Sequence, residues 1–203
     1  MKSYTLKKVH CTPNWDTIPS LAIDIPYEEN CSDIRAHAQL CWDDTGIHVH
    51  LQAVESDIRA EHTGLLDMVC EDSCLEFFLR PTEAMSYFNI EFNLNCALYL
   101  GFGTNRYNCV RLVTQDNQQL FHPRANRTAD GWEVTYYIPF SFIRQFFPSF
   151  VPKKGLRFYG NFYKCASMKT PPHHFSWMPA ITPIINFHCP EHFGQLILGG
   201  KEL

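Results

Sequence analysis

Short segments in which apolar and polar residues alternate one by one recur along most of this chain. In residues 47–54, Ile-His-Val-His-Leu-Gln-Ala-Val, apolar side chains occupy every odd position. Successive side chains of a strand point to opposite faces, so this pattern indicates a strand with one buried face. Residues 35–42 form a similar segment, and the turn residues Asp44–Gly46 separate the two. The pair therefore predicts a β-hairpin.

Comparable segments predict the rest of the fold. Further strands are expected at residues 73–79, 86–94, 97–102, 109–113, 131–139, 156–163 and 195–198. Helical periodicity is scarce, with short turns expected only in residues 140–147 and within 57–68. Many short strands with turn residues between them predict an all-β fold, an antiparallel β-sandwich of the immunoglobulin-like or jelly-roll-like kind with one or two short helical turns. No repeat or linker divides the chain, so we expect one domain over residues 1–203.

Charge and hydropathy exclude some classes of partner. The net charge of −4 argues against a nucleic-acid surface, which needs clustered Lys and Arg. No stretch approaches the roughly 20 apolar residues of a membrane span. The two lysines near the start are not followed by the apolar run of a signal peptide, so we expect a cytoplasmic protein. A chain cleaved from an exported precursor would begin in the same way, and the sequence leaves the oligomeric state open.

Nine cysteines are present, an odd number, and none forms a CxxC pair. A disulfide framework favours an even number, and a zinc ribbon favours paired CxxC motifs. We expect reduced cysteines that pack as small apolar side chains, which agrees with a cytoplasmic location. Histidine pairs, and the five scattered aspartates that could serve a hard cation, show no ligand spacing, so the metal ligands stay unassigned. These aspartates are Asp43, Asp44, Asp57, Asp67 and Asp72.

The most informative polar feature lies in residues 86–94. Tyr87, Asn89 and Glu91 share one strand face, opposite a row of apolar side chains. Glu76 on a neighbouring strand and Asn161 on a third extend the pattern. Carboxylate and amide groups beside a tyrosine suit the hydroxyls of a ligand, so these strands predict a concave binding face. The alternative is an ordinary solvated sheet face.

Two further features have competing interpretations. Trp177 lies in the loop Ser176–Pro179, where its ring could stack on a sugar or fold back over the core. Glu76 and Glu91 could form the pair of carboxylates that a glycosidase needs. Spacing along the chain does not show whether these two groups face each other across a sugar.

Several segments together resemble a known family. In order, they are residues 42–49, 70–81, 87–93, 131–134, 138–139, 160–163, 176–177 and 187–194. This ordered set resembles the family 9 carbohydrate-binding modules and their stand-alone relatives. Those proteins share a sandwich with sugar- and haem-binding domains of the DOMON type. The resemblance covers roughly residues 15–198.

The resemblance implies a non-catalytic β-sandwich that binds sugars. In xylanase-attached members, two tryptophans clamp a terminal sugar, while Glu, Arg and Asn or Gln side chains bond its hydroxyls. The family glutamate looks like Glu76, whereas Cys70 and Phe187 fall near the clamp tryptophans and Asn89 near the arginine. The clamp thus departs from the family pattern, and Trp177 is a candidate replacement. Structural calcium in those members makes Ca²⁺ a candidate cofactor here, without assigned ligands.

We therefore expect non-catalytic binding of a saccharide by this polar face and its flanking aromatic residues. The expected hydrogen-bonding residues are Glu76, Asn89, Glu91 and Asn161, and the expected stacking residues are Tyr87, Trp177 and Phe187. Two alternatives stay open. One is a glycoside hydrolase that uses Glu76 and Glu91. The other is a haem- or metal-binding domain, for which Met68, Met85 and His122 are present without a selecting pattern.

Overall fold

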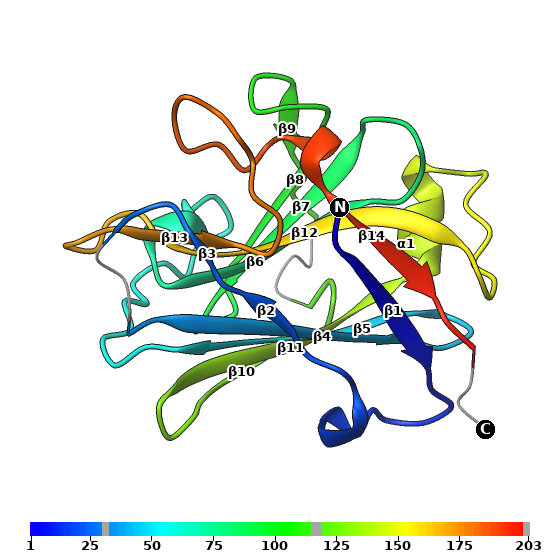
Figure 1. Ribbon diagram of the computed structural model, residues 1–203, viewed down its shortest axis with the longest axis horizontal. Coiled ribbons are helices and arrows are strands. Elements are labelled where there is room, and N and C mark those ends of the chain that lie inside the picture. Colours follow the sequence, from blue (N-terminus) through cyan, green and yellow to red (C-terminus); the bar gives the residue numbers. More distant parts are fainter. Residues whose placement is uncertain (30–32, 115–118, 201–203) are drawn as a thin grey trace.

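The computed structural model describes residues 1–29, 33–114 and 119–200, so Cys31 lies outside the described residues. Its strands pack as two layers, joined along one side (Figure 1). The strands are β1 (Ser3–Lys8), β2 (Leu21–Ile23), β3 (Ile25–Pro26), β4 (Arg35–Trp42), β5 (Gly46–Val54), β6 (Cys74–Arg80), β7 (Tyr87–Asn93), β8 (Leu98–Gly103), β9 (Cys109–Arg111), β10 (Arg124–Arg127), β11 (Gly131–Pro139), β12 (Arg157–Ala166), β13 (His173–Ser176) and β14 (Gly194–Leu198). The helical elements are α1 (Phe140–Phe146) and the 3₁₀ turns η1 (Trp15–Thr17), η2 (Val69–Glu71) and η3 (Pro190–His192).

The lower layer contains β2, β4, β5, β11 and β10, all paired antiparallel. The predicted hairpin is confirmed as β4 and β5, with Trp42 opposite Ile47. Asp43 shapes the turn, because its Oδ1 accepts the backbone N–H groups of Thr45 at 2.7 Å and Gly46 at 2.9 Å. Gly46 itself begins the second strand.

The upper layer contains β14, β12, β6, β7, β8 and β9 in antiparallel order, with β13 and β3 beside one end of β12. Large apolar side chains of both layers fill the space between them, as the alternation predicts. Phe77 and Phe162, for example, stack within this core with ring centroids 4.6 Å apart. The β-sandwich predicted from the sequence is thus confirmed.

The pairing of β1 corrects the expectation of a purely antiparallel fold. Ser3–Leu6 pair parallel to β14, and Lys7 and Lys8 then pair parallel to β4. The chain therefore passes from one layer to the other along this strand, beside β14 (Figure 1). A long connection over residues 9–20, rather than a tight hairpin, joins β1 to β2, so no turn dictates the direction of β1. Its sequence, which buries only Tyr4 and Leu6, gave no clear strand signal.

The helical predictions are confirmed in part. The helix α1 follows β11 directly and buries Phe140, Phe142 and Ile143 against the core. Residues 57–68 contain a hydrogen-bonded turn, in which the Asp67 N–H donates to the Gly64 carbonyl at 3.4 Å, and the 3₁₀ turn η2 begins just after them. Within the described ranges, no helix is long and apolar enough to cross a lipid bilayer.

Candidate binding pocket on the outer face of the upper layer

The predicted polar row of β7 lies on the outer face of the upper layer, but it is covered. Phe88, Ile90 and Phe92 point into the core between the layers, as predicted. Asn89 and Glu91 point the other way, yet they are only 1% and 5% exposed. A second apolar cluster lies on this outer face and contains Val69, Phe78, Tyr87, Tyr163, Phe187 and Phe193. The open, solvated face weighed from the sequence is therefore not what the chain forms.

Asp72 holds one part of this cover in place. Its buried Oδ2 accepts the backbone N–H groups of Glu61 and His62, each at 2.9 Å. The same oxygen accepts Asn93 Nδ2 from the end of β7 at 2.8 Å. A carboxylate with several donors fixes a loop firmly, because charged hydrogen bonds are stronger than neutral ones. Residues 61–72 are thus fastened to the outer face of the sheet.

A small pocket of about 130 Å³ opens through this cover. Glu76 on β6 and Glu91 on β7 line it from the sheet, where they stand directly opposite each other. The remaining lining residues are Cys70, Phe78, Arg106, Cys165, Ser167, His174, Ile185, Phe187 and His188. The pocket therefore combines two carboxyl groups with two thiols, two phenylalanine rings, one guanidinium group and two imidazoles.

Burial controls the protonation of the two carboxyl groups. It raises the pKa of Glu91 to about 7. Burial also raises the pKa of Glu76 well above its usual range, and the neighbouring Glu91 raises it further. Two carboxyl groups this close resist ionising together. The pair can therefore both donate and accept hydrogen bonds near neutral pH.

Two acceptors at this carboxyl pair have no hydrogen-bond partner among the described residues; Glu91 lines the pocket, whereas Asn89 lies beside it on β7 and does not line it. Glu91 Oε1 accepts Asn89 Nδ2 at 2.8 Å, but Glu91 Oε2 and Asn89 Oδ1 are buried without a hydrogen bond. Glu76 Oε1 accepts the Cys165 thiol at 2.9 Å. Buried polar atoms without partners are rare in folded proteins and cost stability. Here they provide places for donors from a bound molecule.

Aromatic residues on the outer face contact one another extensively. Phe187 stacks on Tyr163 with centroids 4.0 Å apart, and Tyr163 Oη donates to the Phe187 carbonyl at 2.9 Å. The hydroxyl of Tyr87 shares a hydrogen bond with His188 Nδ1 at 2.6 Å. Burial, reinforced by Arg106, lowers the pKa of His188 to about 4. The wall beside the carboxyl pair is therefore aromatic and largely neutral at pH 7.

Asn161 and Trp177 do not join this pocket. Asn161 Nδ2 donates to Tyr163 Oη and to the Met178 carbonyl, each at 2.8 Å, while its Oδ1 accepts the N–H of Phe162 and that of Met178. Trp177 is 3% exposed and packs on Phe162 in the core between the layers. Of the two arrangements considered for Trp177, the structure has the one that closes the core.

The sequence interpretation missed several lining residues. Phe78 and Cys165 follow Glu76 and Asn161 at even spacings on their strands, so strand alternation could have placed them on the outer face. Arg106 and His188 come from connecting segments without periodicity. No local signal indicated that these segments return to the sheet.

We expect the contribution of Glu91 to stability to fall as pH rises from about 4.5 to about 7, so the stability of the wild type relative to Glu91→Gln should decrease over this range. The folded protein keeps a proton on Glu91 that the unfolded chain releases, so this contribution is complete below pH 4.5 and is lost as pH rises through about 7. A shift of this size corresponds to about 3 kcal/mol. Urea denaturation of the wild type and Glu91→Gln at both ends of this range would measure it. An equal pH slope in the two proteins would contradict the assignment.

The sandwich and its small polar pocket define a class of protein, the β-sandwich binding modules. Within that class, the chain belongs to carbohydrate-binding family 9, whose model matches residues 24–198. The family resemblance found in the sequence is therefore confirmed.

Solved structures agree with this assignment. A candidate carbohydrate-binding protein from Bacteroides uniformis is 25% identical, with 97% of this chain and 99% of that chain covered and a TM-score of 0.82. A family 9 module from Caldicellulosiruptor kristjanssonii, in complex with cellotriose, is 13% identical over 99% and 95% of the two chains, with a TM-score of 0.70. The glucose complex of a C. kristjanssonii family 9 module is also 13% identical, with 99% of this chain and 97% of that chain covered and a TM-score of 0.69. Both complexes show the shared fold. No curated protein sequence matches the chain.

Proposed function

We propose that this module binds the terminal unit of a saccharide, without catalysis, in the pocket over Glu76 and Glu91. The observation that carries the proposal is Glu91 Oε2, a buried acceptor of a pocket-lining residue that has no hydrogen-bond partner among the described residues, with Asn89 Oδ1 likewise unpartnered beside the pocket. Sugar hydroxyl groups are donors that can satisfy such atoms. Membership of family 9 supports the choice of ligand, as does the C. kristjanssonii module bound to cellotriose and glucose.

The pocket size favours recognition of a chain end. Its volume of about 130 Å³ is below the range of roughly 300–1,000 Å³ that is usual for small-molecule sites. A sugar can therefore insert only one edge between Glu91 and the wall at Phe187 and His188. The rest of the ring would lie at the rim, where the pocket-lining residue Arg106 is exposed.

Geometry favours binding over glycoside hydrolysis. A glycosidase places its two carboxyl groups on either side of the scissile bond. Glu76 and Glu91 instead stand opposite each other on adjacent strands of one sheet, so they would meet the same edge of a ligand. The haem alternative has less support, because Met68, Met85 and His122 lie on separate connecting segments and none of them lines the pocket.

Glu91→Gln and Glu76→Gln should each weaken saccharide binding by about 1–3 kcal/mol, or about 5- to 150-fold in Kd. Each change replaces one carboxyl oxygen with an amide nitrogen, which cannot accept a sugar O–H. Isothermal titration with glucose, cello-oligosaccharides and xylo-oligosaccharides would measure the change, and chromatography would detect any product.

Glu133→Gln in the lower layer provides the matched control, since this partly exposed residue pairs with His50 away from the pocket. Equal affinities in the wild type and both pocket variants would refute the proposed site. Release of shortened sugar by the wild type would support hydrolysis instead.

A further inference from the structure

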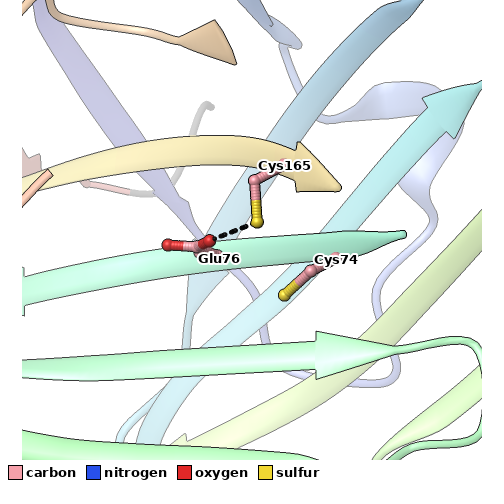
Figure 2. Close-up of side chains that lie close together, drawn as sticks. All are labelled: Cys74, Glu76 and Cys165. Atoms are coloured by element: carbon pink, nitrogen blue, oxygen red, sulfur yellow. Dashed lines mark hydrogen bonds between the residues drawn. The ribbon is translucent and has the colours of Figure 1, made fainter. Parts of the chain in front are cut away.

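Two cysteines and one glutamate converge beneath the pocket. Cys74 and Glu76 are two residues apart on β6, so they share the outer face of the sheet. Cys165 on β12 stands directly opposite Cys74 in the strand register. The two sulfur atoms and a carboxylate oxygen all lie within 4.8 Å of one another. Figure 2 shows the Cys165 thiol directed at the Glu76 carboxylate, with Cys74 beside them.

This environment is unusual for cysteines that serve only as small apolar side chains. Cys74, Glu76 and Cys165 are 0%, 2% and 1% exposed, respectively. An apolar side chain gains nothing from contact with a buried carboxyl group, whereas thiolate and carboxylate groups are both ligands that zinc takes in proteins. A second carboxyl group, Glu91, lies opposite Glu76 and adds to the concentration of acidic groups.

The ligand types select the metal. Thiolate, carboxylate and imidazole bind zinc at about 2.0–2.3 Å, so ligand atoms on one tetrahedral ion are about 3–4 Å apart. Modest side-chain rotations would bring the present atoms to that separation. Calcium needs six to eight oxygen ligands and does not suit sulfur. The cluster therefore does not fit the calcium suggested by the family resemblance.

We propose that Cys74, Glu76 and Cys165 form a zinc site at the base of the pocket. On binding, the two thiols release their protons to solvent, and two thiolates and one carboxylate then surround the divalent ion. Cys70 lines the same pocket, and its carbonyl oxygen is 3.5 Å from Cys165 Sγ. Three protein ligands leave one position of a tetrahedral zinc for a ligand from the pocket, as in sites that keep one position for an exchangeable ligand.

The zinc site shares Glu76 with the proposed saccharide site, but other residues distinguish the two proposals. Zinc occupies the Glu76 carboxylate but leaves Glu91 and Asn89, which hold the acceptors without partners. Glu91→Gln should therefore impair saccharide binding and preserve zinc binding. Failure of one proposal is thus distinguishable from failure of the other.

The test is a zinc titration of the purified, metal-free protein under reducing conditions, against a chromophoric chelator. We expect the wild type to bind one zinc ion per chain at this site. Cys74→Ala and Cys165→Ala should each weaken this binding by about tenfold or more, since each removes a direct ligand. Cobalt should give a thiolate charge-transfer band in the wild type, and the band should be lost in Cys74→Ala/Cys165→Ala.

Two control variants test whether the zinc ion binds at this cluster or elsewhere. Cys41→Ala removes a buried thiol of the lower layer and should leave zinc affinity unchanged. Cys189→Ala tests a second group of ligand-type residues within the described part of the chain, which also contains Glu191 and His192. The proposal is overturned if the wild type binds no zinc. It is also overturned if Cys74→Ala and Cys165→Ala both bind zinc as tightly as the wild type while folded by circular dichroism. Loss of the ion in Cys189→Ala alone would overturn it as well.

Discussion

Lys164→Met should destabilise the protein by about 3–5 kcal/mol. Lys164 lies on β12 with no exposed surface, and its Nζ is 3.1 Å from Glu55 Oε1 at the end of β5. The pair thus links the upper layer to the lower one. Methionine has a similar length but no charge, so the substitution would leave the Glu55 carboxylate buried without its cation.

Other partners of Glu55 cannot replace the lysine. Trp132 Nε1 donates to Glu55 Oε1 at 2.7 Å, and Ser73 Oγ donates to Oε2 at 3.0 Å. His173 accepts a hydrogen bond from Lys164 at 3.0 Å, and burial together with Lys164 lowers its pKa to about 3. These groups are neutral at pH 7. Lys164 therefore supplies the positive charge that balances Glu55 in this network.

Urea denaturation of the wild type and Lys164→Met would measure the effect. Lys169→Met is the control, because its ion pair with Asp57 opens to solvent on the Asp57 side, the two side chains being 13% and 87% exposed. Exposed pairs contribute about 1 kcal/mol or less, so this variant should change little. Adding Glu55→Gln to Lys164→Met should recover part of the loss by removing the unpaired charge. Equal effects of the two lysine variants would contradict the role given to the buried pair.

Trp177→Ala should destabilise the protein by about 3–5 kcal/mol, as expected for a large side chain removed from a core. The Trp177 ring packs on Phe162 and against Gly194, where even a Cβ atom would lie 2.3 Å from the ring. Glycine at residue 194 therefore makes room for the indole. The empty space left by alanine cannot be filled by simple collapse of these rigid strands.

Thermal and urea denaturation would measure this loss, and saccharide titration of the folded protein would test the other interpretation. Trp15→Ala is the control, since Trp15 is half-buried beside His50 near the surface, and its loss should cost about 1 kcal/mol. A stable Trp177→Ala protein that no longer binds saccharide would show that Trp177 stacks on the ligand instead.

Much of the fold follows from local pattern. The strands at residues 35–54, 86–94 and 131–139 were predicted because alternation with period two is a direct result of strand geometry. The same rule assigned Asn89 and Glu91 to the face opposite Phe88 and Ile90, and the structure confirms it. Short strands such as β2 and β3 are too brief to show any period, and they were not predicted.

The candidate site was predictable only in part. Glu76 and Glu91 were identified as a pair, and the strand register places them opposite each other. Their burial was not predictable, because it depends on segments near Asp72 and Phe187 that fold back over the sheet. Those segments have no periodicity that would indicate where they pack on the sheet.

The sequence by itself determined the longer strands, their apolar faces and the family of the module. These features depend on spacings of a few residues and on short segments in a fixed order, which can be identified without information about distant contacts. The tertiary structure decided that β1 pairs parallel with both layers, that Trp177 closes the core, and that Cys74 meets Cys165. Each of these outcomes depends on the register between strands far apart in the chain, which is fixed only when their buried faces pack together.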